Sequence, residues 1–259
     1  MRRITAVAVA LVLLLTGCTA AAAVNTDPQP VGWTGAARML AFRDEFNGTS
    51  LNRTVWTPYW RRDCVGASTM NSVHTCSSNV SYGNGEVDLK LSDSTHGALL
   101  STNPRDGVVG HTGFQFTTGY AEARIWFPGP AGACTIYNWP AWLTDGQSWP
   151  STGEIDIAEA AGWGGSGADY LLSANYHGPN KKAGSGTFSG CWSNGWHTYA
   201  IDRKVGSIDI YVDGAKVWTT ATTDHESPEY LILALGYTDG IQGLGDANAV
   251  RVDYVRVWH

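Results

Sequence analysis

A two-residue alternation of apolar and polar side chains is the feature that most constrains this fold. It runs through residues 120–127, 207–218, 230–237 and 250–258, where β-branched residues are also frequent. Side chains of a β-strand point alternately to opposite faces of its sheet, so each segment predicts a strand. Asp213-Gly214 marks a hairpin turn. After the N-terminal apolar run, no segment of the chain has a sustained apolar stripe with helical spacing. We therefore predict an all-β protein, a jelly-roll sandwich of two antiparallel sheets with a concave groove for an extended ligand.

The N-terminus has the pattern of an exported lipoprotein. Two arginines precede an uncharged apolar run that ends at Leu15 and is too short to span a membrane. The segment from Leu15 to Cys18, LTGC, resembles the lipobox of bacterial lipoproteins, in which the cysteine carries a lipid. We favour this over an ordinary signal peptide cut within 19–24. The prediction is a signal peptide over 1–18, a flexible tether over 19–37 and one domain over 38–259, anchored to the membrane only through Cys18.

The charge balance bears on the kind of partner. The chain has 17 basic residues; removal of Arg2 and Arg3 leaves 15 against 23 acidic residues, a net charge near −8. Nucleic-acid binding needs a basic patch, so we exclude that function. Charged residues are only 15% of the chain, while glycine (31) and tryptophan (12) are abundant. This composition is typical of a secreted β-protein that handles neutral polymers, and we expect a monomer with a polysaccharide partner.

Four cysteines remain beyond the lipobox, and an even number in an exported domain favours two disulfides. They allow three pairings. Cys64 and Cys76 are close enough in sequence to close one loop, which leaves Cys134 to pair with Cys191. A zinc site is the alternative, but the chain has no C-x-x-C spacing. We therefore predict the disulfides.

Three acids stand among apolar residues in the segment 153–163, GEIDIAEAAGW. Burying unpaired carboxylates is costly, so the segment either forms the floor of an open site or turns its acids to water. On a regular strand Glu154 and Asp156 share one face, whereas Glu159, five residues from Glu154, lies on the other. One extra residue, a β-bulge at 157 or 158, would return Glu159 to the first face. Since bulges re-aim side chains beside active sites, we predict that all three acids line one groove.

Two glutamates with an aspartate between them are the inventory of a retaining glycosidase. One carboxylate attacks the anomeric carbon, and the other donates a proton to the leaving oxygen. Asp156 would hydrogen-bond the nucleophile and, as a nearby like charge, keep the pKa of the acid raised. The chain lacks the H-E-x-x-H and G-x-S-x-G motifs of other hydrolases.

Motifs around this segment resemble glycoside hydrolase family 16 from Phe42 to Trp258. They are, in the family's order, FRDEFNGTSLNRTVW, GYAEARIWFP, NWPAW, GEIDIAEAAG, GWHTYAID and VRVDYVRVW. The resemblance is to the laminarinase-like branch with the longer, bulged motif, which also includes agar and carrageenan hydrolases. It implies a β-jelly-roll and a double-displacement mechanism. By matching positions it implies Glu154 as nucleophile, Asp156 as its partner and Glu159 as acid/base.

Substrate contacts are expected from aromatic and polar residues of the groove. Tryptophans offer flat faces on which sugar rings stack, and Trp139 matches the first such position of the family motif W-P-A-F-W-L. Trp142 takes the place of its phenylalanine, and Leu143 replaces its second tryptophan. After the acidic segment, Asn175 and His177 alternate onto one face. We predict substrate contacts for Trp139, Trp142, Asn175 and His177; the alternatives are core packing for a tryptophan and a hydrogen bond to a carbonyl for His177.

The resemblance also implies a calcium ion remote from the chemistry. Its matching positions are Glu45, Gly85 and Asp253, and oxygen ligands of this kind suit calcium. Three ordinary acid or turn positions are the alternative. Such an ion would stabilise the fold, and we expect catalysis to need no cofactor.

The sequence therefore predicts an extracellular endo-acting retaining glycoside hydrolase that cleaves β-linked polysaccharide, with β-1,3(4)-glucan as the first choice of substrate. A galactan hydrolase of the agar, carrageenan or β-1,3-galactan type is the alternative within the family. A jelly-roll that binds polysaccharide without cleaving it, or a structural lipoprotein of the cell envelope, is the alternative outside it. Release of reducing ends distinguishes the enzyme from both.

Overall fold

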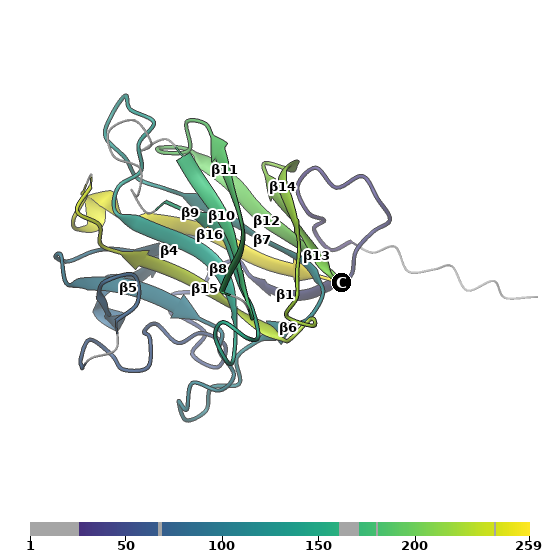
Figure 1. The fold of residues 1–259 in the computed structure, drawn as a ribbon. Helices are drawn as coiled ribbons and strands as arrows, with labels where there is room; N and C mark the ends of the chain where they lie inside the picture. Colours follow the sequence, from purple (N-terminus) through teal and green to yellow (C-terminus); the bar gives the residue numbers. More distant parts are fainter. Residues whose placement is uncertain (1–25, 67–68, 161–170, 180, 241) are drawn as a thin grey trace, which may run out of the picture.

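The computed structural model describes residues 26–66, 69–160, 171–179, 181–240 and 242–259, and it confirms the predicted all-β sandwich. Two eight-stranded sheets pack face to face, and the described ranges contain no α-helix (Figure 1). We call them the back sheet and the groove sheet. The back sheet has the order β14 (Ala215–Ala221), β13 (Ser207–Val212), β12 (Trp196–Lys204), β7 (Gly119–Trp126), β16 (Val250–Trp258), β4 (Glu86–Leu89) and β3 (Val80–Gly83), with β1 (Leu40–Asp44) also paired to β16.

The groove sheet carries the acidic segment near its centre. Its order is β11 (Lys181–Ser189), β10 (Leu171–Gly178), β9 (Glu154–Glu159), β8 (Trp139–Gly146), β15 (Glu229–Gly236), β5 (His96–Ser101) and β2 (His74–Thr75), with β6 (Gln115–Phe116) also paired to β15. All pairs in both sheets are antiparallel except β2 with β5, which is parallel. Two short 3₁₀ turns complete the described elements, η1 (Ser77–Asn79) and η2 (Asp246–Asn248).

The core lies between the two sheets and follows the predicted alternation. On β13, Ile208, Ile210 and Val212 face inward and are at most 3% exposed. The hairpin to β14 turns at Asp213-Gly214, where both residues have positive φ (49° and 77°), as the predicted tight turn requires. The two-residue alternation of the sequence therefore correctly predicts which side chains of β13 face the core.

A buried ion-pair cluster lies under the start of β9. The guanidinium of Arg203, on β12, binds the carboxylate of Asp224 and lies 3.1 Å from that of Glu229, and all three side chains are at most 1% exposed. Gly153, with φ +85°, passes directly over this cluster, and a Cβ atom there would collide with an oxygen of Glu229. Glycine is therefore required where the chain enters β9.

Both predicted disulfides are present in the structure. Cys64 is bonded to Cys76, and Cys134 is bonded to Cys191, the latter across 57 residues of sequence. The first ties the loop before β2 to the groove sheet. The second joins the loop after β7 to the segment before β12.

Part of the predicted tether belongs to the folded domain. The carbonyl of Pro28 accepts a hydrogen bond from the Trp258 indole (2.7 Å), and the Val31 amide donates to the carboxylate of Glu122 (3.0 Å). The packed chain therefore begins earlier than the predicted residue 38, because this segment packs against β16 and β7 in the middle of the back sheet. The signal peptide, Cys18 and residues 19–25 of the tether lie outside the described residues. Within the described ranges, no helix is long and apolar enough to cross a membrane.

Candidate active site

Strand β9 contains the predicted bulge. Asp156 faces Leu143 on β8 and Asn175 on β10, whereas Glu159 faces Ala141 and Ser173. Between these two levels β9 has two residues and each neighbouring strand has one, so β9 carries one extra residue. Both intervening residues, at 157 and 158, are fully buried in the core. The bulge therefore places Glu154, Asp156 and Glu159 on the same face, as the sequence analysis predicted.

The three acids line one cavity of about 480 Å³ on the groove sheet. This volume is within the range of small-ligand pockets. Three of the four predicted substrate residues line the same cavity: Trp139 from β8, and Asn175 and His177 from β10. The structure thus brings together residues from three adjacent strands.

Two side-chain donors hold the carboxylate of Glu159. The indole N–H of Trp139 donates to Oε1 (2.8 Å), and the amide of Asn175 donates to Oε2 (2.9 Å). Asn175 is itself oriented by Ser185, whose hydroxyl donates to the amide oxygen of Asn175 (2.9 Å). Hydrogen bonds of this kind stabilise a carboxylate and fix its direction. Glu159 is therefore held in one orientation toward the cavity.

Glu154 lies at the other end of the bulged segment in an environment that opposes its negative charge. Burial raises its pKa to about 8, and the nearby charge of Asp156 acts in the same direction. Two groups favour its charge: His177 through its positive field, and Trp149, whose indole N–H donates to Oε2. The ionised form of Glu154 is consequently a high-energy state of the free protein.

His177 is bound to the middle acid. Its Nε2 lies 3.3 Å from Oδ2 of Asp156, which is 3% exposed. This hydrogen bond raises the pKa of His177, and the neighbouring charges of Asp156 and Glu154 add to the effect. His177 therefore lines the cavity and tends to keep its proton. Its hydrogen-bond partner is the carboxylate of Asp156, not a carbonyl group as the alternative interpretation of the sequence expected.

One predicted substrate residue is wrong. Trp142 is fully buried in the core between the sheets and cannot contact a ligand in the groove. It is three residues from Trp139 on β8, and an odd spacing places two side chains on opposite faces of a strand. Trp139 faces the cavity, so Trp142 must face the core.

Four further residues line the cavity and were not predicted. They are Asn71, Trp149, Ser173 and Ser185. Trp149 lies in the loop between β8 and β9 and is 58% exposed, which is unusual for so large an aromatic residue. The loop sequence GQSWPSTG has no periodicity that assigns a direction to its tryptophan, although an exposed aromatic among turn residues is itself a signal of binding.

The predicted calcium positions do not form a cluster of free carboxylates. Glu45 is bound through both oxygens by Arg256 (2.8 and 2.7 Å), and Asp253 is bound by Arg124 (2.6 Å). A calcium ion at Glu45, Gly85 and Asp253 therefore stays a prediction, and its ligands would have to include backbone oxygens. Among the residues that the structure describes, one acidic group could hold a metal: Glu154, Asp156 and His177, with donor atoms within 4.8 Å of one another. The hydrogen bond between His177 and Asp156 already satisfies two of these donors.

A β-sandwich with three carboxylates on the floor of an open groove has the fold and the site of a glycoside hydrolase. The family model described as glycosyl hydrolases family 16 matches residues 67–256. The chain belongs to this family.

A curated relative is the glucan endo-1,3-beta-glucosidase A1 of Niallia circulans, 24% identical over 273 residues. The alignment covers 90% of this chain and 39% of that protein, so the chain spans less than half of its relative.

Solved structures share the fold at 22–23% identity. SCLam, described as a non-specific endo-β-1,3(4)-glucanase, has a TM-score of 0.68 and covers 90% of this chain and 94% of its own. The laminarinase from Rhodothermus marinus has a TM-score of 0.66, with 86% and 97% covered. A third structure, from work on endo-acting O-glycanases of the human gut microbiota that initiate mucin breakdown, has a TM-score of 0.67, with 90% and 94% covered. The same fold thus accompanies different named substrates.

Proposed function

We propose that this protein is an exported, endo-acting glycoside hydrolase that cleaves β-1,3(4)-glucan with retention of anomeric configuration. The observation that carries the proposal is the bulge in β9, which turns Glu154, Asp156 and Glu159 toward one cavity. A binding protein needs aromatic platforms and hydrogen-bonding groups. It does not need two glutamates held on one face by an irregular strand.

Burial raises the pKa of Glu154 to about 8, so Glu154 must first lose its proton. In the first step its carboxylate then attacks the anomeric carbon of the sugar. Glu159 donates its proton to the glycosidic oxygen, which leaves with the second half of the chain. A glycosyl ester of Glu154 remains. In the second step Glu159, now ionised, takes a proton from water, whose oxygen attacks the same carbon from the opposite side. The ester bond breaks, the Glu154 carboxylate leaves, and the sugar regains its original configuration.

The environment of Glu154 favours this first step. Its negative charge is destabilised by burial and by Asp156, and that charge disappears when the glycosyl ester forms. Asp156 is at the same time bound to Nε2 of His177 (3.3 Å). The energy that opposes ionisation of Glu154 therefore also makes its carboxylate more reactive toward the sugar.

Trp139 and Asn175 position the acid/base. Both hold the carboxylate of Glu159 when it is ionised, the state reached after its proton has gone to the leaving oxygen. Their donation is thus strongest in the state that must next activate water. The exposed face of Trp149 and the groove face of Trp139 supply surfaces for sugar rings.

The test is a set of polysaccharides with product analysis. Full-length protein is incubated with laminarin, lichenan, β-1,3-galactan, agarose and carrageenan, and the products are identified. Proton NMR during the first minutes gives the anomer released. The proposal expects internal cleavage of laminarin and lichenan with the β-anomer first; release of the α-anomer, or cleavage of galactans alone, would contradict it. Binding without reducing ends would establish a non-catalytic protein.

A galactan substrate is the second candidate because of one position in β8. Leu143 stands where the family motif has its second tryptophan, and it is 2% exposed beneath the groove residues. A sugar-stacking platform of the laminarinase motif is therefore missing at this place.

The exported location is supported by the two disulfides, which form and persist in oxidising compartments. We propose lipid attachment at Cys18 from the lipobox resemblance. Mass spectrometry of the N-terminal peptide from the native membrane fraction tests it: a diacylglycerol on Cys18 is expected, and a mature N-terminus beyond residue 20 would refute the anchor.

A further inference from the structure

A second cavity adjoins the active site on the other side of Trp149. Its volume is about 280 Å³, and Trp149 lines both cavities. The second cavity is formed by the loop that contains Tyr59 to Arg61, by the loop that contains Arg105, and by the end of β8 at Asp145. A polysaccharide bound across Glu154 and Glu159 would extend directly into it.

Two arginines line this second cavity without a carboxylate partner. Both are exposed, and neither Arg61 nor Arg105 makes an ion pair among the residues that the structure describes. The carboxylate of Asp106, which also lines the cavity, is already bound to His111 (2.8 Å) and to the hydroxyl of Thr57. Two guanidinium groups without an ion pair thus line one cavity of a chain whose formal net charge is −6.

A buried oxygen at the floor of the cavity also lacks a partner. Asp145 is 8% exposed, and its Oδ2 accepts a hydrogen bond from the hydroxyl of Tyr230 (2.9 Å). Its Oδ1 is buried and accepts no hydrogen bond from the part of the chain that the structure describes. Buried polar atoms are nearly always hydrogen-bonded, so an unpartnered acceptor that lines a cavity indicates a ligand donor such as a sugar hydroxyl.

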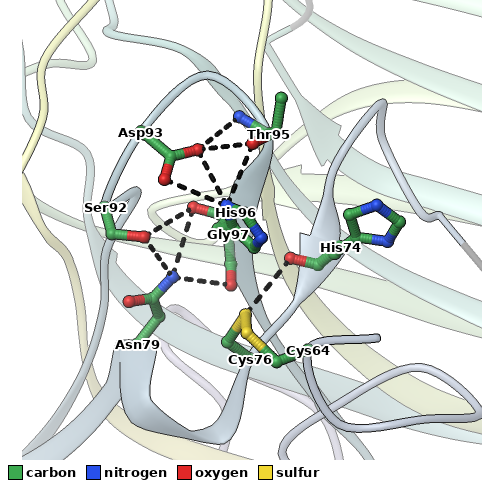
Figure 2. A network of polar contacts seen from close by, with 9 residues as sticks. All are labelled: Cys64, His74, Cys76, Asn79, Ser92, Asp93, Thr95, His96 and Gly97. Carbon is green, nitrogen blue, oxygen red and sulfur yellow. Dashed lines mark hydrogen bonds and ion pairs between the residues drawn. A yellow bond between two sulfur atoms is a disulfide. The ribbon is translucent and has the colours of Figure 1, made fainter. Parts of the chain in front are cut away.

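The loop that carries Arg61 is held in place. The disulfide from Cys64 to Cys76 joins it to β2, and the amide of Trp60 donates to the hydroxyl of Thr75 (2.6 Å). Figure 2 shows the next layer of this support, in which Asn79 donates to the carbonyl oxygens at positions 96 and 97 on β5. Arg61 therefore projects from a braced loop, which lowers the entropic cost of binding a ligand there.

We propose that this second cavity is a sugar subsite that binds an anionic residue of the polysaccharide, through a sulfate ester or a carboxylate. Arg61 and Arg105 would bind the anionic group with their planar forks, Asp145 would accept a hydroxyl of the same ring, and Trp149 would stack on it. The inference rests on the proposed function, because it needs a chain bound across the catalytic residues. It changes the substrate from a neutral polymer, which the composition indicated, to a chain with negative groups near the cleaved bond.

The test compares neutral and charged polymers of the same backbone. The pairs are laminarin with sulfated laminarin, laminarin with carboxymethylated laminarin, and agarose with κ-carrageenan. The proteins are the full chain, Arg61→Met, Arg105→Met, the double variant, and Arg62→Met as the control. Arg62 is an exposed arginine of the same loop that does not line the cavity. The sulfated and carboxymethylated arms distinguish the two sources of negative charge.

For the full chain at low salt we expect kcat/KM to be at least about tenfold higher on the charged member of one pair. The double variant should lose about 10- to 100-fold on that polymer, the effect of losing charge-assisted hydrogen bonds, and less than about threefold on its neutral partner. Added salt should reduce the preference for the charged polymer, because salt screens the interaction between charges. The control variant Arg62→Met should keep this preference.

Equal preference for neutral and charged polymers, or equal losses on both in the double variant, would overturn the subsite. Arginine-dependent preference within the galactan pair, with no cleavage of any glucan, would uphold the subsite and refute the glucanase proposal. Cleavage of glucans without charge preference would uphold the glucanase proposal and refute the subsite. If no polymer is cleaved, titration calorimetry with oligosaccharides of the same pairs decides the subsite by the same criteria.

Discussion

Replacing the proposed nucleophile should stabilise the protein, and the gain should depend on pH. Glu154 has its pKa raised from 4.5 to about 8 by burial and by Asp156. Between these two pH values the folded protein holds a proton on Glu154 that the unfolded chain has released. The free energy of unfolding of the wild type therefore falls as pH rises through this window. Glu154→Gln has nearly the same shape, keeps an acceptor for the Trp149 indole, and has no charge to bury.

The size of the effect follows from the pKa. A rise of about 3.5 pH units corresponds to roughly 5 kcal/mol between the two protonation states, at about 1.4 kcal/mol per unit. His177 and Asp156 titrate together with Glu154 and redistribute part of this energy. We expect the variant to be more stable by about 2–3 kcal/mol at pH 8.5 and by less than about 0.5 kcal/mol at pH 4.5. For a chain of this size the first figure raises Tm by about 5–10 °C.

Urea and thermal unfolding of wild type and Glu154→Gln at pH 4.5, 6.5 and 8.5 measure this directly. Glu226→Gln, at a half-buried loop position, is the control for replacing a glutamate elsewhere, and the glutamine oxygen can still accept the hydrogen bond that the Gly206 amide donates to Oε1 of Glu226 (2.7 Å). Its effect should be small and the same at each pH. A stability difference for Glu154→Gln that does not grow with pH would refute the reasoning, since it would show that the charge of Glu154 is not destabilised in the folded state.

Three further predictions concern single features of the structure. Trp142→Ala should lower the free energy of unfolding by about 3–5 kcal/mol, because it opens a cavity in the core. Trp149→Ala should change the free energy of unfolding by less than about 0.5 kcal/mol and should instead raise KM; equal destabilisation by both variants would contradict the placement of these tryptophans. Replacing both cysteines of the Cys134–Cys191 disulfide by serine should cost about 4 kcal/mol, from the 57 residues that it spans, and an unchanged urea midpoint would show that it does not constrain the unfolded chain. Trp139→Phe should keep the stacking surface but remove one donor to the acid/base glutamate, lowering kcat/KM by about tenfold at unchanged stability; an unchanged rate would remove that donor from the mechanism.

The sheets and the catalytic face were predictable because both depend on the two-residue period of a strand. The spacing of Glu154, Asp156 and Glu159 conflicted with that period, and a bulge was the local solution that resolved the conflict. The same rule contained the correct answer for Trp142. Its odd spacing from Trp139 on β8 puts it on the core face, whatever residue the family motif has at that position.

The remainder of the site could not be predicted because it comes from loops and from pairing between distant segments. Trp149 and Asn71 lie in segments whose direction depends on turns and on contacts elsewhere in the fold. The buried cluster of Arg203 with Asp224 and Glu229 has the same origin, since its members belong to β12, a loop and β15. No short stretch of sequence predicts that these three charged side chains lie together beneath Gly153.

Trapping the glycosyl-enzyme tests the central claim most directly. The protein is incubated with an activated 2-deoxy-2-fluoro-β-laminaribioside, which slows both steps and leaves the ester in place, and the peptides are then analysed by mass spectrometry. The label is expected on Glu154, with Glu159→Gln still labelled by the activated sugar and Glu154→Gln unlabelled. A label on Glu159, or an unlabelled protein that turns over the β-glucan with inversion, would contradict the assignment of Glu154 as the nucleophile.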